Sequence, residues 1–168
     1  MAQTVAGPSQ ICNPPSGCLS CLSISALATE LTPEQTETLF KRVQVRKLSK
    51  GETLISEGTH DDHLFAIARG EFGVYRKGVR GEENLARLKP GMIAGELAFL
   101  DGLTRTASVK AEQDESCVIA LRRDELESFL PEDPLLVYKV MRSIVRAAHR
   151  TVGTMDGVYS DLMHYISG

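Results

Sequence analysis

Glycines divide the middle of the chain into short segments, and this spacing restricts the fold more than any other feature. Between residues 43 and 121 they recur roughly 7 to 12 residues apart, at Gly51, Gly58, Gly70, Gly81 and Gly91. The intervening segments are apolar and short enough to be strands rather than helices. Regular turns at this spacing are typical of a small antiparallel sandwich or barrel, so the sequence predicts a mainly β fold.

Several stretches of this region have the pattern of β-strands. Residues 43–45 and 54–55 are rich in branched apolar side chains. The stretch HLFAIARGEFGVYRKG (residues 63–78) alternates apolar and polar residues, which predicts a hairpin turning at residues 69–71. The apolar run CVIAL (residues 117–121) predicts a final buried strand.

Helices are expected on both sides of the strand region. Thr32, Pro33 and Gln35 form a capping-box pattern with proline at the first helical position, so a helix is predicted from there to about residue 42. After the strands, RRDELESFL predicts a short helix, and Asp133 followed by Pro134 predicts the start of a long one. The expected organisation is an irregular cysteine-containing arm (1–25), a helix with the β domain (26–132) and a long C-terminal helix (133–168).

The long C-terminal helix carries an apolar seam whose members are spaced alternately three and four residues apart. They are Tyr138, Met141, Val145, Ala148, Val152, Met155, Tyr159, Leu162 and Ile166. Such a repeat is the signature of a coiled-coil interface. At about 1.5 Å per residue, the seam is longer than one small barrel can cover. The sequence therefore predicts a homodimer through this helix; the alternative is a helix packed against its own barrel.

Composition excludes several classes of protein. The chain has 168 residues, 42% of them hydrophobic, with a formal net charge of −3. This charge argues against a surface that generally coats nucleic acid. No apolar run is long enough to span a membrane, and the N-terminal residues do not resemble a secretory signal. We therefore expect a cytoplasmic protein without membrane association.

The stretch GELAFLDGLTRTASV (residues 95–109) places one arginine among small residues that cannot hold it by packing. Arg105 could instead face a bound anion, with the Thr106 hydroxyl as a further donor and a helix N-terminus near Gly95. Glu96 would be unfavourable beside a phosphate, but it could accept a hydrogen bond from a sugar hydroxyl. The alternative is a surface turn in which Arg105 pairs with Glu96 or Asp101.

The motif Gly95-Glu96-Leu97-Ala98 followed by Arg105-Thr106-Ala107 resembles the phosphate-binding cassette of the cyclic nucleotide-binding domain. The resemblance covers about residues 30 to 165 and implies an eight-stranded β-roll flanked by helices. It also implies that Glu96 binds the ribose 2′-hydroxyl and that Arg105 and Thr106 bind the cyclic phosphate. A backbone cradle would come from Gly95, Leu97 and Ala98. Thr151 on the long helix would contact the base, and cAMP is the ligand expected first.

The order of arm, helix, roll and long helix is most similar to the CRP/FNR superfamily of bacterial regulators. Those regulators continue into a helix-turn-helix domain, whereas this sequence ends at Gly168. The resemblance thus implies a sensory module that signals as a dimer through a protein partner, without direct DNA binding. No nucleophile–base pair or phosphate-binding loop of the Walker type is apparent, so we expect no enzymatic activity. A purely structural dimerisation partner is a further alternative.

Four cysteines raise a competing hypothesis. Cys12, Cys18, Cys21 and Cys117 could together hold a zinc ion or an iron–sulfur cluster. The resemblance to FNR-type sensors, which bind a [4Fe–4S] cluster through such cysteines, implies a redox or gas sensor. The arm spacing is the reverse of the usual FNR order, however, and Cys117 could simply be a core residue.

The stretch THDDH (residues 59–63) holds two histidines and two aspartates, which could bind a metal. We expect it to form a turn in which an aspartate accepts hydrogen bonds from backbone amides.

Overall fold

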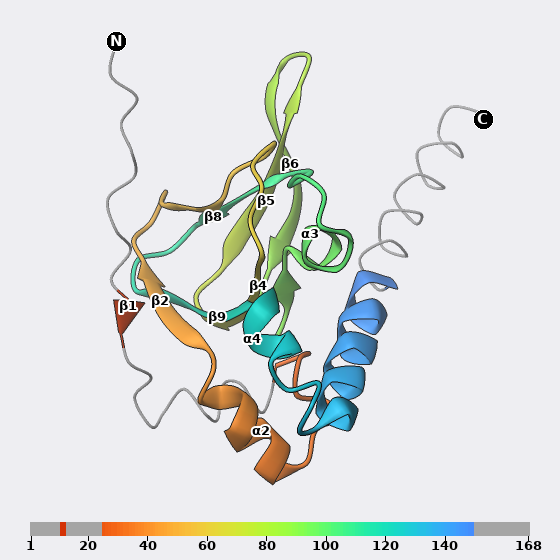
Figure 1. Ribbon diagram of the computed structural model, residues 1–168. Coiled ribbons are helices and arrows are strands. Elements are labelled where there is room, and N and C mark those ends of the chain that lie inside the picture. The colour runs from red at the N-terminus through yellow and green to blue at the C-terminus, as the bar shows by residue number, and fades with distance from the viewer. Residues whose placement is uncertain (1–10, 13–24, 150–168) are drawn as a thin grey trace, which may run out of the picture.

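The computed structural model describes residues 11–12 and 25–149. Its N-terminal and C-terminal helices lie together at one end of two β-sheets, whereas the short helix α3 (Glu96–Asp101) lies beside the sheets (Figure 1). The first helix, α2 (Pro33–Phe40), begins at the predicted capping box. The Thr32 hydroxyl accepts from the Gln35 backbone N–H at 3.2 Å, and the Gln35 side chain accepts from the Thr32 N–H at 3.3 Å. These paired bonds satisfy two amides that the helix itself leaves free, which explains why the sequence alone located this helix start.

Two antiparallel sheets form the body of the domain. The first has the strand order β1-β2-β9-β4-β7 and the second β3-β8-β5-β6. The strands span Ile11–Cys12 (β1), Gln44–Leu48 (β2), Thr53–Ile55 (β3), His63–Arg69 (β4), Phe72–Gly78 (β5), Gly81–Leu88 (β6), Ile93–Ala94 (β7), Ser108–Ala111 (β8) and Ser116–Arg122 (β9). The predicted mainly β roll with flanking helices is therefore confirmed.

The predicted hairpin over residues 63–78 is wrong. Strands β4 and β5 follow one another, but β4 pairs with β7 and β9 whereas β5 pairs with β6 and β8. At the turn, Gly70 has a φ of +82°, and a Cβ there would lie 2.2 Å from the Ser116 hydroxyl oxygen. The turn carries the chain from one sheet to the other, so β4 and β5 face each other across the inter-sheet core, where Phe65 and Phe72 both lie. Alternation along a strand does not reveal its partner.

The core has two parts. One lies between the sheets and contains large side chains such as Phe65 and Phe72. The other lies between the first sheet and the helices, and includes Leu39 of α2 and Leu126 of α4 (Arg123–Glu127). Among the described residues, no helix is long and apolar enough to cross a membrane.

The described part of the C-terminal helix covers residues 134–149. The Asp133 carboxylate accepts from the Leu136 N–H at 2.9 Å, which confirms the predicted helix start. The face formed by Leu136, Val140 and Ile144 is fully buried against the core. The predicted seam lies beside that face, and its members Tyr138 and Val145 are 58% and 48% exposed. This helix therefore packs on its own domain, with the seam member Met141 against the core, and presents Tyr138 and Val145 to solvent.

Basic side chains of this helix contact α2 and the segment that precedes it. Arg142 forms an ion pair with Glu30 at 3.3 Å, and Arg146 pairs with the same carboxylate. The Lys139 ammonium donates to the Gln35 side-chain oxygen at 2.9 Å. These cations therefore join the C-terminal helix to the N-terminal side of the domain.

Candidate functional site

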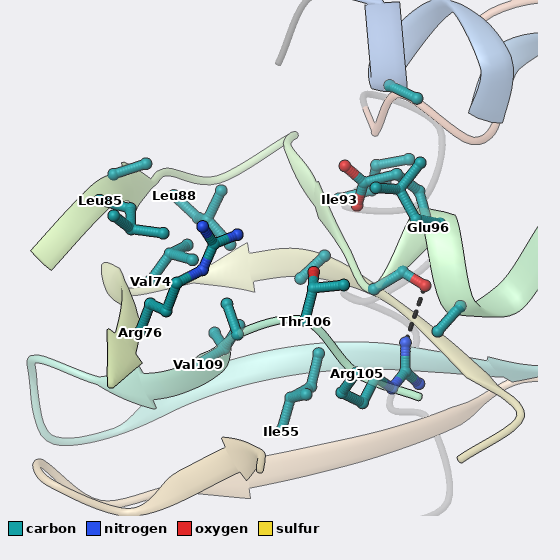
Figure 2. Close-up of a pocket in the computed structure, with 17 residues that line it drawn as sticks. Ile55, Val74, Arg76, Leu85, Leu88, Ile93, Glu96, Arg105, Thr106 and Val109 are labelled. Atoms are coloured by element: carbon teal, nitrogen blue, oxygen red, sulfur yellow. Dashed lines mark hydrogen bonds between the residues drawn. The ribbon is translucent and has the colours of Figure 1, made fainter. Parts of the chain in front are cut away.

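A cavity of about 200 Å³ opens between the second sheet, the short helix α3 (Glu96–Asp101) and the C-terminal helix. Figure 2 shows its two ends. Polar groups of residues 95–106 occupy one end, and aliphatic side chains of β5, β6 and β8 occupy the other. The lining comprises Ile55, Val74, Arg76, Leu85, Ala86, Leu88, Ile93, Ala94, Gly95, Glu96, Leu97, Ala98, Arg105, Thr106, Ala107, Val109 and Ala148. A mainly apolar hollow with a few converging polar groups is the usual form of a small-molecule site.

Arg105 is the buried cation of this cavity, with 3% of its surface exposed. Its Nη1 donates to the Gly95 carbonyl at 2.8 Å (Figure 2), and its Nη2 donates to the His63 carbonyl at 2.5 Å. Nη2 also pairs with the Asp61 carboxylate at 3.1 Å. The buried Nε has no hydrogen-bond partner among the described residues. The surface turn with Glu96 or Asp101 is therefore not what holds Arg105.

Asp61 supplies the counter-charge from the loop before β4. Its carboxylate also accepts from the His63 backbone N–H at 3.0 Å and contacts the His63 ring, which confirms the predicted turn in THDDH. Burial raises the pKa of this carboxyl, but the His63 hydrogen bond and the charges of His63 and Arg105 outweigh burial and lower the pKa to about 2. Asp61 is therefore ionised across the neutral range.

Gly95 allows the guanidinium of Arg105 to lie against the backbone. Its φ is +83°, a left-handed conformation that favours glycine, and it forms the N-cap of α3. A Cβ at this position would lie 2.3 Å from Nη1 of Arg105. Any larger residue would therefore displace the arginine, which is the physical reason for glycine at the start of this motif.

Glu96 follows Gly95 at the first position of α3 and lines the cavity. Burial raises the pKa of its carboxyl, and a backbone hydrogen bond and the charge of Arg105 offset only part of that effect. Among the described residues, no other side chain forms an ion pair or hydrogen bond with it. Glu96 is thus a partly buried acceptor that faces the cavity without a side-chain partner.

The structure brings together the predicted cassette residues that it describes. Beside Arg105 and Glu96, the cavity is lined by Gly95, Leu97, Ala98 and Thr106. Thr151 lies outside the described residues. Ala148, which precedes it by three positions, lines the cavity from the C-terminal helix.

Sequence reasoning missed two charged residues. Asp61 was expected only to shape a turn, and nothing in its local sequence indicates the contact with Arg105, 44 positions away. Arg76 lines the cavity from β5. Its signal was available, because it alternates with Phe72 and Val74 and so belongs to the inward face of that strand.

The cysteines are not brought together in the described residues. Cys117 is a partly buried residue of β9. The backbone of Cys12 pairs with β2, which lies between β1 and β9, so two strand spacings, about 10 Å, separate the two cysteine backbones in that direction. Cys18 and Cys21 lie outside the described residues. Within residues 25–149, no group of three or more potential ligands could hold a metal ion. The iron–sulfur hypothesis therefore finds no support here.

Comparison with known proteins agrees with this geometry. The "CRP-like cAMP-activated global transcriptional regulator" of Mycobacterium tuberculosis is 28% identical over 77% of this chain and 58% of its own length. The "cGMP-dependent protein kinase egl-4" of Caenorhabditis briggsae is 38% identical over 51% of this chain and 11% of its own length. The chain thus spans little more than half, or less, of these curated relatives.

A solved structure agrees over most of the chain. The cyclic nucleotide-binding domain from Methylobacillus flagellatus KT superposes with a TM-score of 0.75 at 25% identity, covering 86% of this chain and 82% of that one. The family model for the cyclic nucleotide-binding domain matches residues 45–133, which is just over half of the chain. That range contains the polar end of the cavity, residues 95–106, and also Asp61, which pairs with Arg105. The chain therefore belongs to the cyclic nucleotide-binding domain family, as the cassette motif indicated, and CRP-like regulators are among its relatives.

Proposed function

We propose that this chain is a sensory module that binds a 3′,5′-cyclic nucleotide in the cavity between α3 and the second sheet. One observation carries the proposal: buried Arg105 and the partly buried carboxylate of Glu96, which has no side-chain partner, occupy one end of a cavity whose other end is mainly aliphatic. A cyclic nucleotide has the matching order of groups, with an anionic phosphate, a ribose hydroxyl and a flat base.

Each residue has a distinct proposed role. The phosphate takes the free Nε–H of Arg105 and the Thr106 hydroxyl, and Asp61 holds the guanidinium in place from behind. Glu96 accepts a hydrogen bond from the ribose 2′-hydroxyl. Gly95, Leu97 and Ala98 bring the α3 backbone close to the ligand. A contact between Thr151 and the base stays a prediction.

Calorimetric titration tests this function directly. We would measure cAMP first, because relatives are named for cAMP, together with cGMP and the non-cyclic 5′-AMP as a control. We expect micromolar binding of a cyclic nucleotide that is lost in Arg105→Ala and retained in Arg122→Ala. Arg122 is a matched control because it is an exposed arginine of β9 that pairs with Asp124. Absence of binding by wild-type protein would contradict the proposal.

We also propose that the module acts as a homodimer through the seam of the C-terminal helix. The support is the exposure of Tyr138 and Val145, two large apolar side chains one heptad apart on the helix surface. In sedimentation velocity, Val145→Glu should produce a monomer. Leu135→Glu is the matched control, because Leu135 is 55% exposed on the same helix but lies off the seam. A wild-type monomer, or equal effects of both variants, would contradict this interface.

The remaining expectations follow from this assignment. The module is proposed to pass its signal to a protein partner, without catalysis of its own. Ligand binding would favour one position of the C-terminal helix, which touches the cavity at Ala148. The division into arm, β domain and long helix, and the cytoplasmic location, stay predictions of the sequence.

A further inference from the structure

Arg76 is a second cation at the cavity, at the end opposite Arg105. It lies on β5 and shares the strand face of Phe72 and Val74, both of which pack in the inter-sheet core. An arginine whose only role was contact with water would be expected on the opposite face of the strand, where Lys77 lies. Figure 2 shows the Arg76 guanidinium beside Val74 and Leu88, with Arg105 at the far side of the cavity.

Arg76 has no partner among the described residues, although acidic residues lie close to it on β6. Its cross-strand neighbour is Glu83, but the Glu83 carboxylate folds over Gly78. The preceding Glu82 is held by the Lys110 ammonium at 2.7 Å. The neighbouring carboxylates are therefore directed elsewhere, and the exposed side chain of Arg76, which lines the cavity, keeps its donors free for a ligand.

The side chains around Arg76 suit a planar ring with apolar faces. Val74, Leu85, Leu88 and Val109 line this end of the cavity. A guanidinium offers only donors and no acceptor, in a planar fork that suits two adjacent acceptor atoms. A planar ring that fills this end would therefore gain most if its edge presented two acceptors.

We propose that Arg76 reads the base edge of the nucleotide and favours guanine over adenine. The inference rests on the proposed function, because a phosphate at Arg105 directs the base toward Arg76. Guanine presents O6 and N7, both acceptors, whereas adenine presents N7 beside an amino group that is itself a donor. Arg76 therefore adds affinity for cGMP, while cAMP binds through its phosphate and ribose without this contact.

The test compares two ligands in three proteins by calorimetry: the wild type, Arg76→Ala and Lys77→Ala. Lys77 is the matched control, because its exposed side chain lies on the opposite face of the same strand. Its replacement by alanine also removes one positive charge. We expect Arg76→Ala to lower the affinity for cGMP about tenfold, within the range for one bidentate contact to a base. It should leave cAMP within about twofold, and Lys77→Ala should change neither ligand appreciably.

A ligand analogue sharpens the result. The analogue 7-deaza-cGMP lacks the N7 acceptor, so it should bind the wild type more weakly than cGMP does. The Arg76→Ala variant should bind the analogue and cGMP with the same affinity. Equal weakening of cGMP and cAMP in Arg76→Ala would overturn the inference, because it would show a general effect of charge. No change for either ligand would also overturn it. Binding of neither nucleotide to wild type would overturn the proposed function itself, so the two failures are distinguishable.

Discussion

The two arginines that line the cavity are held in opposite ways. Arg105 is 3% exposed and bound to two carbonyls and the Asp61 carboxylate. Arg76 is exposed and has no partner among the described residues. A buried charge needs neutralising contacts before any ligand arrives, whereas an exposed one is stabilised by water. The same residue type can therefore be part of the folded framework at one end of a site and an adjustable contact at the other.

The largest expected effect separates the two arginines by stability. Arg105→Ala removes one partner of a buried pair and should lower the free energy of unfolding by about 3 kcal/mol, the low end for such pairs because Asp61 is partly exposed. Arg76→Ala should change it by less than about 0.5 kcal/mol. Urea denaturation measures both. Equal losses in the two variants would contradict the distinction between framework and adjustable contact.

A glycine pair tests how closely Arg105 depends on the backbone. Gly95 and Gly102 cap the two ends of α3, with φ values of +83° and +72°. Gly102→Ala should lower the free energy of unfolding by about 1 kcal/mol through backbone strain alone. Gly95→Ala should cost about 1–3 kcal/mol more, because its Cβ would lie 2.3 Å from Nη1 of Arg105 whereas the nearest atom to a Cβ at Gly102 is 3.4 Å away.

Nucleotide titration of these two glycine variants gives the second readout. Gly95→Ala should weaken binding, because the arginine must move, and Gly102→Ala should bind like wild type. Comparable affinity losses in both variants would show that strain in α3 matters more than the position of Arg105.

The pH dependence of binding should separate Glu96 from Asp61. Burial raises the pKa of Glu96 above 4.5, so acidification protonates it first and should weaken its proposed bond to a ribose hydroxyl. Asp61, with a pKa of about 2, stays ionised over the same range. Affinity should therefore begin to fall at a pH above 4.5, and Glu96→Gln should bind more weakly and lose this component of the pH dependence.

Acidification should affect stability through Glu96 in the direction opposite to its effect on ligand affinity. A carboxyl whose pKa is raised by folding binds its proton more tightly in the folded state, so protonation of Glu96 stabilises the unliganded protein as the pH falls. Asp61 contributes stability that is fully present above pH 3.8 and is lost as the pH falls from there through about 2. Affinity and Glu96-linked stability should thus move in opposite directions on mild acidification; a parallel fall would contradict the burial of Glu96.

A small effect is also expected where exposed arginines are already paired. Arg142 and Arg146 both contact Glu30; the two arginine side chains are 45% and 54% exposed, and the Glu30 side chain is 17% exposed. Glu30→Gln should lower the free energy of unfolding by less than about 1 kcal/mol, and high salt should remove most of that difference because exposed ion pairs are screened. Thermal denaturation at low and high salt would measure it. A loss as large as that of Arg105→Ala would contradict the link between burial and cost.

Local signals in the sequence were sufficient for the helix starts, the turns and the polar motif. The capping box of Thr32 and Gln35 and the N-cap of Asp133 involve neighbours within one helical turn, so their residue types are informative on their own. The motif around Glu96 and Arg105 was also recognisable, because a ligand cradle formed by one loop needs its residue types at a set spacing.

Tertiary structure alone decided which strands pair and what neutralises the buried arginine. Alternation predicted β4 and β5 correctly as strands but joined them in one hairpin, although they belong to different sheets. Asp61 meets Arg105, and Arg76 reaches the apolar end of the cavity, only after the two sheets have packed together. Periodicity shows which side of a strand is buried, whereas pairing and charge neutralisation depend on segments far apart in the chain.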